Sequence, residues 1–521
     1  MRRAFNASPN RGFLWVTVVF GALCGCLGFA NPLFHFPPAA VLFPAGLTIC
    51  GLMASGGKRA FRLGFFSGLI FFSLSLYWVV VPLHWYGGMP FALALPVPVL
   101  MALYLSLYPA FFCLGVYLCR DRLPWPLLGI LCACLFALLE VLRGFLLSGF
   151  PWMLLPSAFA IWPSLLQLLP FVGPDALTAL LTLCAAWFGL GLVRRNIAAT
   201  ASGLILFGLI MAYGVMAMDS PAHSGRRVKI GLIQGNIDQA QKWDNAYMDL
   251  SVSKYVRLTA GLLSREPCDL VLWPETALPF SFQQDSPRAA AVRLLIQEEE
   301  TPLLVGAPGY EASDLASGNP LFFNRAFLLD QEGRTVGIYD KEHLVPFGEY
   351  MPLDLNLPFL ENLSLGVGNF APGQQTKPLR LDPFSLGMLI CYEAIFSGLS
   401  QDRVAEGANL LVNISNDAWF GRTAAAGQHL HLSALRAVEQ GRYMVRCTNT
   451  GISAVIDSRG RIIEPSGLFE DKAFAVEARL LEQTTVYHRL RPLIIPILAA
   501  IAGVLLLSAL LTRRRSPRNF F

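Results

Sequence analysis

The feature that most constrains the fold is the uneven spread of charge along the 521-residue chain. The first 218 residues contain 11 Lys and Arg residues but only three acidic residues. Residues 219–512 contain 25 Lys and Arg residues and 32 Asp and Glu residues, so this part is acidic. A segment so poor in charge cannot form a water-exposed surface, and the chain therefore divides into an apolar first part, a soluble middle and an apolar end.

Several apolar stretches have the length of membrane-spanning helices, which need about 20 residues to cross a bilayer. Eight such stretches lie at residues 13–30, 37–55, 61–82, 90–118, 125–145, 164–192, 199–217 and 493–512. We expect the first stretch to remain in the protein, because no small-x-small cleavage site is followed by a soluble mature domain. The sequence thus predicts a membrane α-helical bundle of eight spans.

The loops between the predicted spans indicate their direction. Fourteen Lys and Arg residues fall in the N-terminal segment, in three connections on the same side, or in the C-terminal tail. The opposite short loops hold at most Arg143. Because cytoplasmic loops are enriched in Lys and Arg, both termini are predicted in the cytoplasm and the soluble middle outside it.

These patterns predict three parts. Residues 1–218 form a transmembrane domain of seven helices, residues 219–491 an extracytoplasmic domain, and residues 492–521 an eighth transmembrane helix with a basic cytoplasmic tail. Glu140 and Arg143 lie three apart near the outer end of the fifth span. A charged pair there is costly unless matched, so we favour a mutual ion pair, with a functional role as the alternative.

In the soluble middle, short apolar strands alternate with amphipathic helices. The strands are expected at 228–234, 270–273, 303–306, 327–329, 387–390, 410–414 and 453–456, and the helices near 244–264, 287–299, 398–406 and 425–440. Short buried strands separated by helices are typical of sheets covered by helices, that is, a layered α/β domain. The acidic charge of this part argues against nucleic-acid binding, which needs a basic face.

The 11 cysteines show neither the spacing of a metal site nor the framework of a disulfide-rich domain. Cys268, Cys391 and Cys447 lie in the soluble part, where a bridge between Cys268 and Cys447 stays open. Cys391 follows a predicted buried strand, a position from which a side chain reaches the crevice above an α/β sheet. It is therefore either a nucleophile or, as most free cysteines are, a small buried residue.

Two further strand ends carry reactive side chains. Glu275 follows the strand that ends at Trp273, and Lys341 follows the strand that ends in Tyr339 and Asp340. A thiolate nucleophile, a carboxylate that moves protons and a cation that stabilises an oxyanion are together sufficient for acyl transfer. Each residue alone is weak evidence, but the three together predict a catalytic site.

The motifs around these residues resemble the nitrilase superfamily. They are Trp-Pro-Glu at 273–275, Tyr-Asp-Lys-Glu-His-Leu-Val-Pro-Phe-Gly-Glu at 339–349, Ile-Cys-Tyr-Glu at 390–393 and Asn-Asp-Ala-Trp-Phe-Gly at 416–421. Together with the eight predicted spans, they resemble most its membrane-bound branch, the bacterial apolipoprotein N-acyltransferases.

The resemblance implies a nitrilase-like α-β-β-α sandwich at 219–491, on the periplasmic side of the bacterial inner membrane. It implies transfer of a fatty acyl chain from a phospholipid donor to a diacylated apolipoprotein acceptor through a thioester on Cys391, with Glu275 and Lys341 completing a triad. It also implies supporting or substrate-binding roles for Trp243, Asn324, Glu349, Tyr392, Glu393 and Trp419. We expect no cofactor and no metal, and the lipid bilayer as a partner.

The apolar loop at 351–371 is expected to act as a lid toward lipid, or else to pack on the domain's own core. Two other functions remain as alternatives. A membrane-anchored nitrilase-type hydrolase of a small amide would use the same three residues but leave the eight spans unexplained. A transporter with an inactive binding module would require charged or polar residues in mid-span and inverted repeats, whereas mid-span charge is almost absent.

Overall fold

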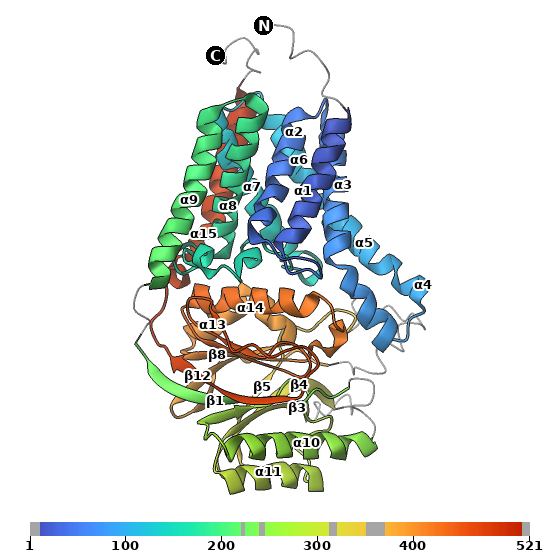
Figure 1. Cartoon of the computed structure of the whole chain (residues 1–521), viewed down its shortest axis with the longest axis vertical. Coiled ribbons are helices and arrows are strands. Elements are labelled where there is room, and N and C mark those ends of the chain that lie inside the picture. Colours follow the sequence, from blue (N-terminus) through green and yellow to red (C-terminus); the bar gives the residue numbers. More distant parts are fainter. Residues whose placement is uncertain (1–10, 220–223, 239–244, 312–319, 351–369, 513–521) are drawn as a thin grey trace. The chain divides into compact units, whose positions relative to one another are not determined.

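A computed structural model describes residues 11–219, 224–238, 245–311, 320–350 and 370–512. The chain forms two compact units (Figure 1). One unit consists of helices and contains the apolar first part and the apolar end of the chain. The other contains residues 221–484 together with a short segment from the first part, residues 78–94.

The first unit is a bundle of apolar helices. They are α1 (Arg11–Gly28), α2 (Leu42–Met53), α3 (Gly57–Ser75), α5 (Pro96–Leu105), α6 (Leu107–Cys119), α7 (Trp125–Arg143), α8 (Leu169–Arg194), α9 (Ile197–Asp219) and α15 (Val486–Leu511). Small residues let these helices approach closely: a side chain at Gly68 of α3 would meet Pro109 of α6 and Ser106 just before it. Glu140 and Arg143 form the expected pair, with 3.4 Å between Oε1 and Nη2.

Five helical stretches among the described residues are long and apolar enough to cross a bilayer: Phe91–Cys119, Trp125–Arg143, Leu169–Arg194, Ile197–Asp219 and Val486–Leu511. A sixth is possible if Gly57–Ser75 and Tyr77–Tyr86, bent by 54°, form one span, and Gly12–Gly28 and Pro37–Met53 are shorter. The chain is thus a membrane protein with several apolar helices, whereas the count of eight spans stays a prediction.

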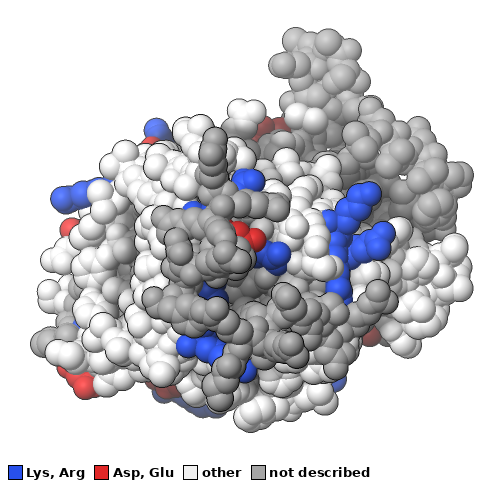
Figure 2. Space-filling model, turned by 90° about the horizontal axis from the view of Figure 1, so that it is seen from above, with Lys and Arg blue, Asp and Glu red and all other residues white. Residues whose placement is uncertain are grey.

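Three basic connections of this unit lie at one end of the bundle. The guanidinium of Arg194, in the last turn of α8, donates to the carbonyl of Arg120, which follows α6. Arg120 in turn donates to the carbonyl of Ala54, just before α3, at 2.7 Å. In the view from above, Lys and Arg side chains are more prominent than Asp and Glu (Figure 2).

The second unit is built around two six-stranded sheets. One has the order β12-β1-β2-β3-β4-β5 and the other β11-β10-β9-β8-β7-β6. The strands of the first sheet are β12 (Lys472–Leu480), β1 (Arg226–Gln234), β2 (Leu270–Leu272), β3 (Leu303–Glu311), β4 (Leu321–Leu329) and β5 (Thr335–Asp340). Those of the second are β11 (Ile462–Ile463), β10 (Ala454–Ile456), β9 (Met444–Thr448), β8 (Leu410–Ser415), β7 (Phe384–Ile390) and β6 (Leu379–Leu381).

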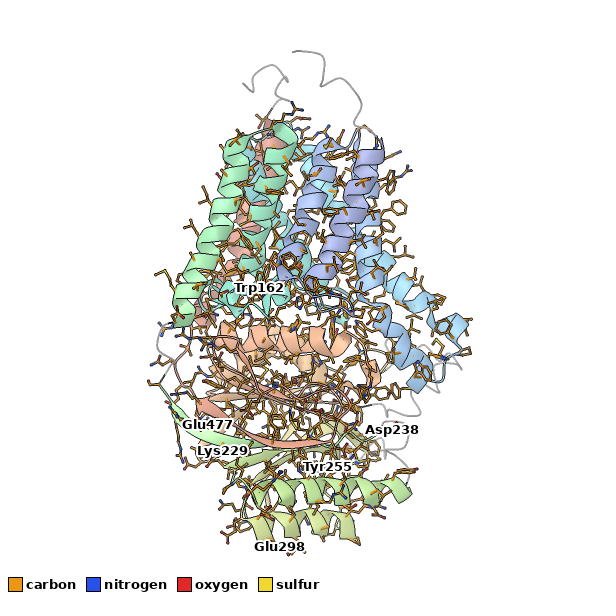
Figure 3. The ribbon with its side chains drawn as sticks, viewed as in Figure 1. Trp162, Lys229, Asp238, Tyr255, Glu298 and Glu477 are labelled. Carbon is orange, nitrogen blue, oxygen red and sulfur yellow. The ribbon has the colours of Figure 1, made fainter. Side chains whose placement is uncertain are left out.

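Helices cover the outer face of each sheet, as the ribbon shows: α10 (Asn245–Leu263) and α11 (Pro287–Glu299) lie on the first sheet, and α13 (Ser397–Ala405) and α14 (Ala425–Gln440) on the second (Figure 1). The alternation of side chains along β1 explains the layers. Ile230 and Leu232 face the core between the sheets, whereas Ile233 faces the core under α10 and α11, where Tyr255 packs (Figure 3). The predicted nitrilase-like α-β-β-α sandwich is therefore confirmed.

The segment 78–94 packs on this sandwich, although no sequence pattern anticipates the contact. The indole nitrogen of Trp78 donates to Oε1 of Gln428 on α14, at 3.1 Å. The Trp78 ring also lies 4.9 Å from that of Phe420, and the Tyr86 ring lies 5.3 Å from that of Trp419. The loop at 416–421 is thus in contact with a segment that comes from far earlier in the chain.

Candidate active site

Cys391 lies directly after β7, at the carboxyl end of a strand that pairs in parallel with β8. Its φ is +51°, a left-handed conformation that non-glycine residues seldom adopt and that is often found at functional sites. The side chain is 9% exposed. Burial and the nearby Glu275 raise the pKa of the Cys391 thiol, while Lys341 lowers it, so the resting side chain is a thiol within electrostatic reach of both residues.

Glu275 follows β2 and is held by two donors. Its Oε1 accepts from the carboxamide of Asn324 at 2.7 Å, and its Oε2 accepts from the backbone N–H of Asn416 at 2.8 Å. Gly306 on β3 makes room for this loop, because a Cβ there would lie 2.8 Å from the Glu275 Cα. The carboxylate is therefore fixed in place by its surroundings.

Lys341 follows β5, and its ammonium is almost fully buried, with 1% exposure. It lies 2.9 Å from Oε1 and 2.8 Å from Oε2 of Glu349, and 3.5 Å from Oε1 of Glu275. Burial alone lowers the pKa of Lys341, but the two carboxylates more than offset it and raise the pKa above its usual value. Lys341 is therefore a permanent cation.

Asn324 connects the two carboxylates. Its Nδ2 donates to Glu275, as above, and to Oε1 of Glu349 at 2.8 Å. The second oxygen of Glu349 also accepts from the backbone N–H of Val345 at 2.8 Å. Because Glu349 is nearer to Lys341 than Glu275 is, Glu349 neutralises the ammonium and leaves Glu275 with negative charge available to accept a proton.

Glu393, two residues after Cys391, connects the nucleophile strand to the segment that follows Lys341. Its carboxylate accepts from the backbone N–H of Ile390 at 2.6 Å, of Glu342 at 2.7 Å and of His343 at 3.1 Å. The hydroxyl of Tyr339 also donates to it at 2.9 Å. A single buried carboxylate therefore fixes the spacing between Cys391 and the Lys341 segment.

The remaining predicted site residues are placed as follows. Tyr392 is half-buried, its ring packs 5.3 Å from that of Phe396, and it interacts electrostatically with Cys391 and Lys341. Trp419 lies against Tyr86, as described above. Trp243 and residues 351–369 of the predicted lid lie outside the described residues.

The structure brings Glu275, Lys341 and Cys391 together with Asn324, Glu349, Tyr392 and Glu393. It also adds residues that sequence reasoning missed: the backbone of Asn416, and Asn413, Asp417, His429 and Arg446 behind Cys391. Asn416 and Asp417 belong to a motif that was noted, whereas nothing in the sequence distinguishes His429 or Arg446 from other polar residues on a helix or strand.

No group of three or more His, Cys, Asp and Glu side chains within the described ranges could hold a metal ion. The eleven cysteines are all described and all free, so Cys268 and Cys447 are not bonded to each other. Burial raises the pKa of the Cys447 thiol to about 12, and this thiol donates to the carbonyl of Leu272 at 3.2 Å, as an inert core residue does.

Comparison with protein families gives two matches. The N-terminal domain of apolipoprotein N-acyltransferases matches residues 12–187, and the carbon-nitrogen hydrolase family matches residues 229–481. Among solved structures, a carbon-nitrogen hydrolase from Helicobacter pylori G27 aligns with 49% of this chain and 90% of its own, at 17% identity and a TM-score of 0.37.

Curated relatives match over nearly the whole chain. The apolipoprotein N-acyltransferase of Geobacter metallireducens is 37% identical, over 98% of this chain and 97% of that protein. The apolipoprotein N-acyltransferase of Caulobacter vibrioides is 34% identical, over 93% of this chain and 90% of that protein.

Proposed function

This chain belongs to the apolipoprotein N-acyltransferase family, and on that premise we propose that it transfers a fatty acyl chain from a phospholipid to the N-terminal α-amine of an S-diacylglyceryl-cysteine apolipoprotein. The observation that carries the proposal is the cluster of Cys391, Glu275 and Lys341, in which Glu349 pairs with the lysine.

In the first half-reaction, Glu275 accepts the proton of the Cys391 thiol and the thiolate attacks the ester carbonyl of the phospholipid. The negative charge of the tetrahedral intermediate falls on the former carbonyl oxygen, which the Lys341 ammonium and a backbone N–H stabilise. The carbon–oxygen bond then breaks, the lysophospholipid leaves with the proton from Glu275, and a thioester remains on Cys391.

In the second half-reaction, the α-amine of the apolipoprotein attacks the thioester and Glu275 removes its proton. A free α-amine has a pKa of about 7.7–8.0, so a single carboxylate suffices as the base. The carbon–sulfur bond breaks, the thiol recovers its proton, and the amide product leaves. The overall exchange of an ester and an amine for an alcohol and an amide needs no cofactor.

We further propose that the chain crosses the bacterial inner membrane several times, with both termini in the cytoplasm and the catalytic unit in the periplasm. The support is the contact of Arg194 with Arg120 and of Arg120 with the carbonyl of Ala54, which brings three basic connections to one end of the bundle. Phospholipid and diacylated apolipoprotein, the proposed substrates, both reside in such a membrane.

The alternative, an amide hydrolase, is less well supported. The carbon-nitrogen hydrolase family matches only residues 229–481, whereas the relatives that match more than nine-tenths of the chain are named N-acyltransferases. A hydrolase would deliver the acyl group of the thioester to water instead of to an amine.

The proposal is tested with the purified full-length chain in vesicles that contain a phospholipid with an isotope-labelled acyl chain. Without an acceptor, we expect one labelled acyl mass on the peptide that contains Cys391, removed by hydroxylamine and absent in Cys391→Ala. With a diacylated lipopeptide, the label should move to its N-terminus. Release of labelled fatty acid while the lipopeptide stays unchanged would instead indicate a hydrolase.

A further inference from the structure

The backbone carbonyl of Cys391 is held by two buried side chains that lie behind the nucleophile. The Nε2 atom of His429, on α14, lies 3.0 Å from this oxygen. The Nδ2 atom of Asn413, on β8, donates to it at 3.3 Å and to the carbonyl of Leu389 at 2.8 Å. A carbonyl oxygen only accepts hydrogen bonds, so both side chains must present a proton to it.

Arg446, on β9, contacts both side chains from the side opposite Cys391. Its Nη2 lies 3.1 Å from Nδ1 of His429, and its Nη1 donates to Oδ1 of Asn413. A guanidinium has only donors, so Oδ1 of Asn413 accepts from it and the carboxamide turns its NH₂ toward Cys391. For His429, the Cys391 carbonyl itself requires a proton on Nε2, while Nδ1 faces both Arg446 and Oδ1 of Asp417, the latter at 3.2 Å.

Asp417 balances the charge of this buried group. Its Oδ2 lies 2.7 Å from Nη2 of Arg446, and its Oδ1 accepts from the hydroxyl of Ser415 at 2.7 Å. Burial raises the pKa of Asp417, but the adjacent Arg446 guanidinium outweighs it and holds the pKa below its usual value. Burial and Arg446 lower the pKa of His429 below its usual value, although the contact of its Nδ1 with Oδ1 of Asp417, at 3.2 Å, acts in the other direction.

The consequence concerns the peptide between Cys391 and Tyr392. In a trans peptide, the carbonyl and the following N–H point in opposite directions. Because the carbonyl of Cys391 points into the buried group, the N–H of Tyr392 points away from it. The left-handed φ of Cys391 costs free energy, and the two hydrogen bonds to its carbonyl offset that cost.

We propose that Asn413, His429 and Arg446 are positioning residues: they fix the Cys391–Tyr392 peptide so that the Tyr392 N–H and the Lys341 ammonium face the oxyanion together. This inference rests on the proposed acyl transfer. None of the three residues touches the substrate; they act through the backbone of the nucleophile. Removal of the His429 donor frees the peptide to rotate, which misplaces both the thiol and the oxyanion donor.

Two polar variants of His429 test this without leaving a large cavity. The amide nitrogen of His429→Gln can take the place of Nε2 and reach the Cys391 carbonyl. His429→Asn can replace only Nδ1, so it still accepts from Arg446 but does not reach that carbonyl. Cys447→Ala, on the same strand as Arg446, is the control for loss of core packing in this unit.

The measurement is the rate constant of Cys391 acylation by phospholipid without an acceptor, with thermal unfolding measured in parallel. In His429→Asn we expect this rate constant to fall about 100-fold at saturating phospholipid, with an unchanged half-saturating concentration, because positioning alone is lost. His429→Gln should recover most of the rate. Cys447→Ala should lower the unfolding temperature and leave the rate constant near that of wild type.

Equal rate constants in His429→Gln and His429→Asn, when both are folded, would overturn the inference. If His429→Asn does not fold, Asn413→Ser removes the other donor and is compared with Cys447→Ala in the same way. If wild type itself acquires no acyl group on Cys391, the proposed function fails, and that outcome is distinct from a failure of the positioning role.

Discussion

One carboxamide nitrogen of Asn324 donates to both carboxylates of the site, at 2.7 Å to Glu275 and 2.8 Å to Glu349. This arrangement keeps two acidic side chains close together, with one ammonium between them. The two carboxylates differ in their partners, since Glu349 pairs with Lys341 and Glu275 accepts from Asn324 and the Asn416 backbone.

Replacement of this shared donor should disable the site. Asn324→Asp places a third carboxylate beside Glu275 and Glu349, which already share the Lys341 ammonium. The three carboxylates will then bind a proton between them, and Glu275 will no longer act as a base. We expect acylation of Cys391 to fall by about 100-fold or more. Asn409→Asp, a buried asparagine of the same unit that holds the Pro383 carbonyl, is the control. A similar loss in both variants would assign the effect to misfolding.

Glu349→Gln separates the two carboxylates. Lys341 would then pair with Glu275, its other carboxylate at 3.5 Å, and the base would be neutralised. We expect acylation to slow by about 100-fold, the range typical of general base catalysis. The control is Glu477→Gln on β12, an exposed glutamate opposite Lys229 on β1 (Figure 3). An unchanged acylation rate in Glu349→Gln would contradict the assignment of Glu275 as the base.

Two variants should change the pKa of the Cys391 thiol in opposite directions. Glu275 raises this pKa and Lys341 lowers it. At a fixed pH below the thiol pKa, Glu275→Gln should therefore increase the rate of Cys391 alkylation by iodoacetamide, and Lys341→Met should decrease it, since only the thiolate reacts.

Both of these variants should nevertheless lose acyl transfer, because the reaction needs a base and a cation. The rate of alkylation of the Cys391 peptide is followed by mass spectrometry over a pH series. This rate should rise with pH in wild type and in both variants. If Glu275→Gln shifts the alkylation profile to higher pH, the electrostatic account of this thiol is wrong.

Glu393→Gln tests the link between the nucleophile strand and the Lys341 segment. The amide has one acceptor oxygen where the carboxylate has two, so at least one of the three backbone N–H groups loses its partner. An unsatisfied buried donor costs about 1–3 kcal/mol. We expect the free energy of unfolding to fall by that amount, and acylation to slow. Glu406→Gln, exposed after α13, should change neither.

Reporter fusions test the proposed orientation. Green fluorescent protein fused after Phe521 should fluoresce, because it folds in the cytoplasm. Alkaline phosphatase inserted at the exposed Gln331–Glu332 turn should be active, because it forms its disulfides only outside the cytoplasm. If the fluorescent protein stays dark and the phosphatase stays inactive, the predicted direction of all spans is reversed.

The layered α/β fold could be predicted because most strands are short apolar runs between polar helices. Several strands of the sandwich were missed, and β9 and β12 show why. In β9 the buried Arg446 interrupts the apolar run, so Met444–Thr448 does not look like a core strand. In β12 Val476 and Ala478 alternate with Glu477 and Arg479, a period-two signal that identifies a strand with one exposed face.

The central residues of the site could be placed because Glu275, Lys341 and Cys391 each follow a strand, and strand ends on facing sheets can meet. Their pairing could not be predicted. Glu349 lies nearer to Lys341 than Glu275 does, and this difference depends on how the backbone turns at Val345. The contacts of His429 with Cys391 depend on the packing of α14 on the second sheet, which one sequence does not encode as a local pattern.

The contact between Trp78 and Gln428 means that the catalytic unit is not a continuous piece of chain. A gene fragment that begins after the seventh predicted span would encode both sheets. It would omit Trp78 and Tyr86, whose rings pack against Phe420 and Trp419. Those rings would then meet water, and the truncated product would tend to aggregate. A soluble form of this enzyme would therefore need residues 78–94 fused to the fragment.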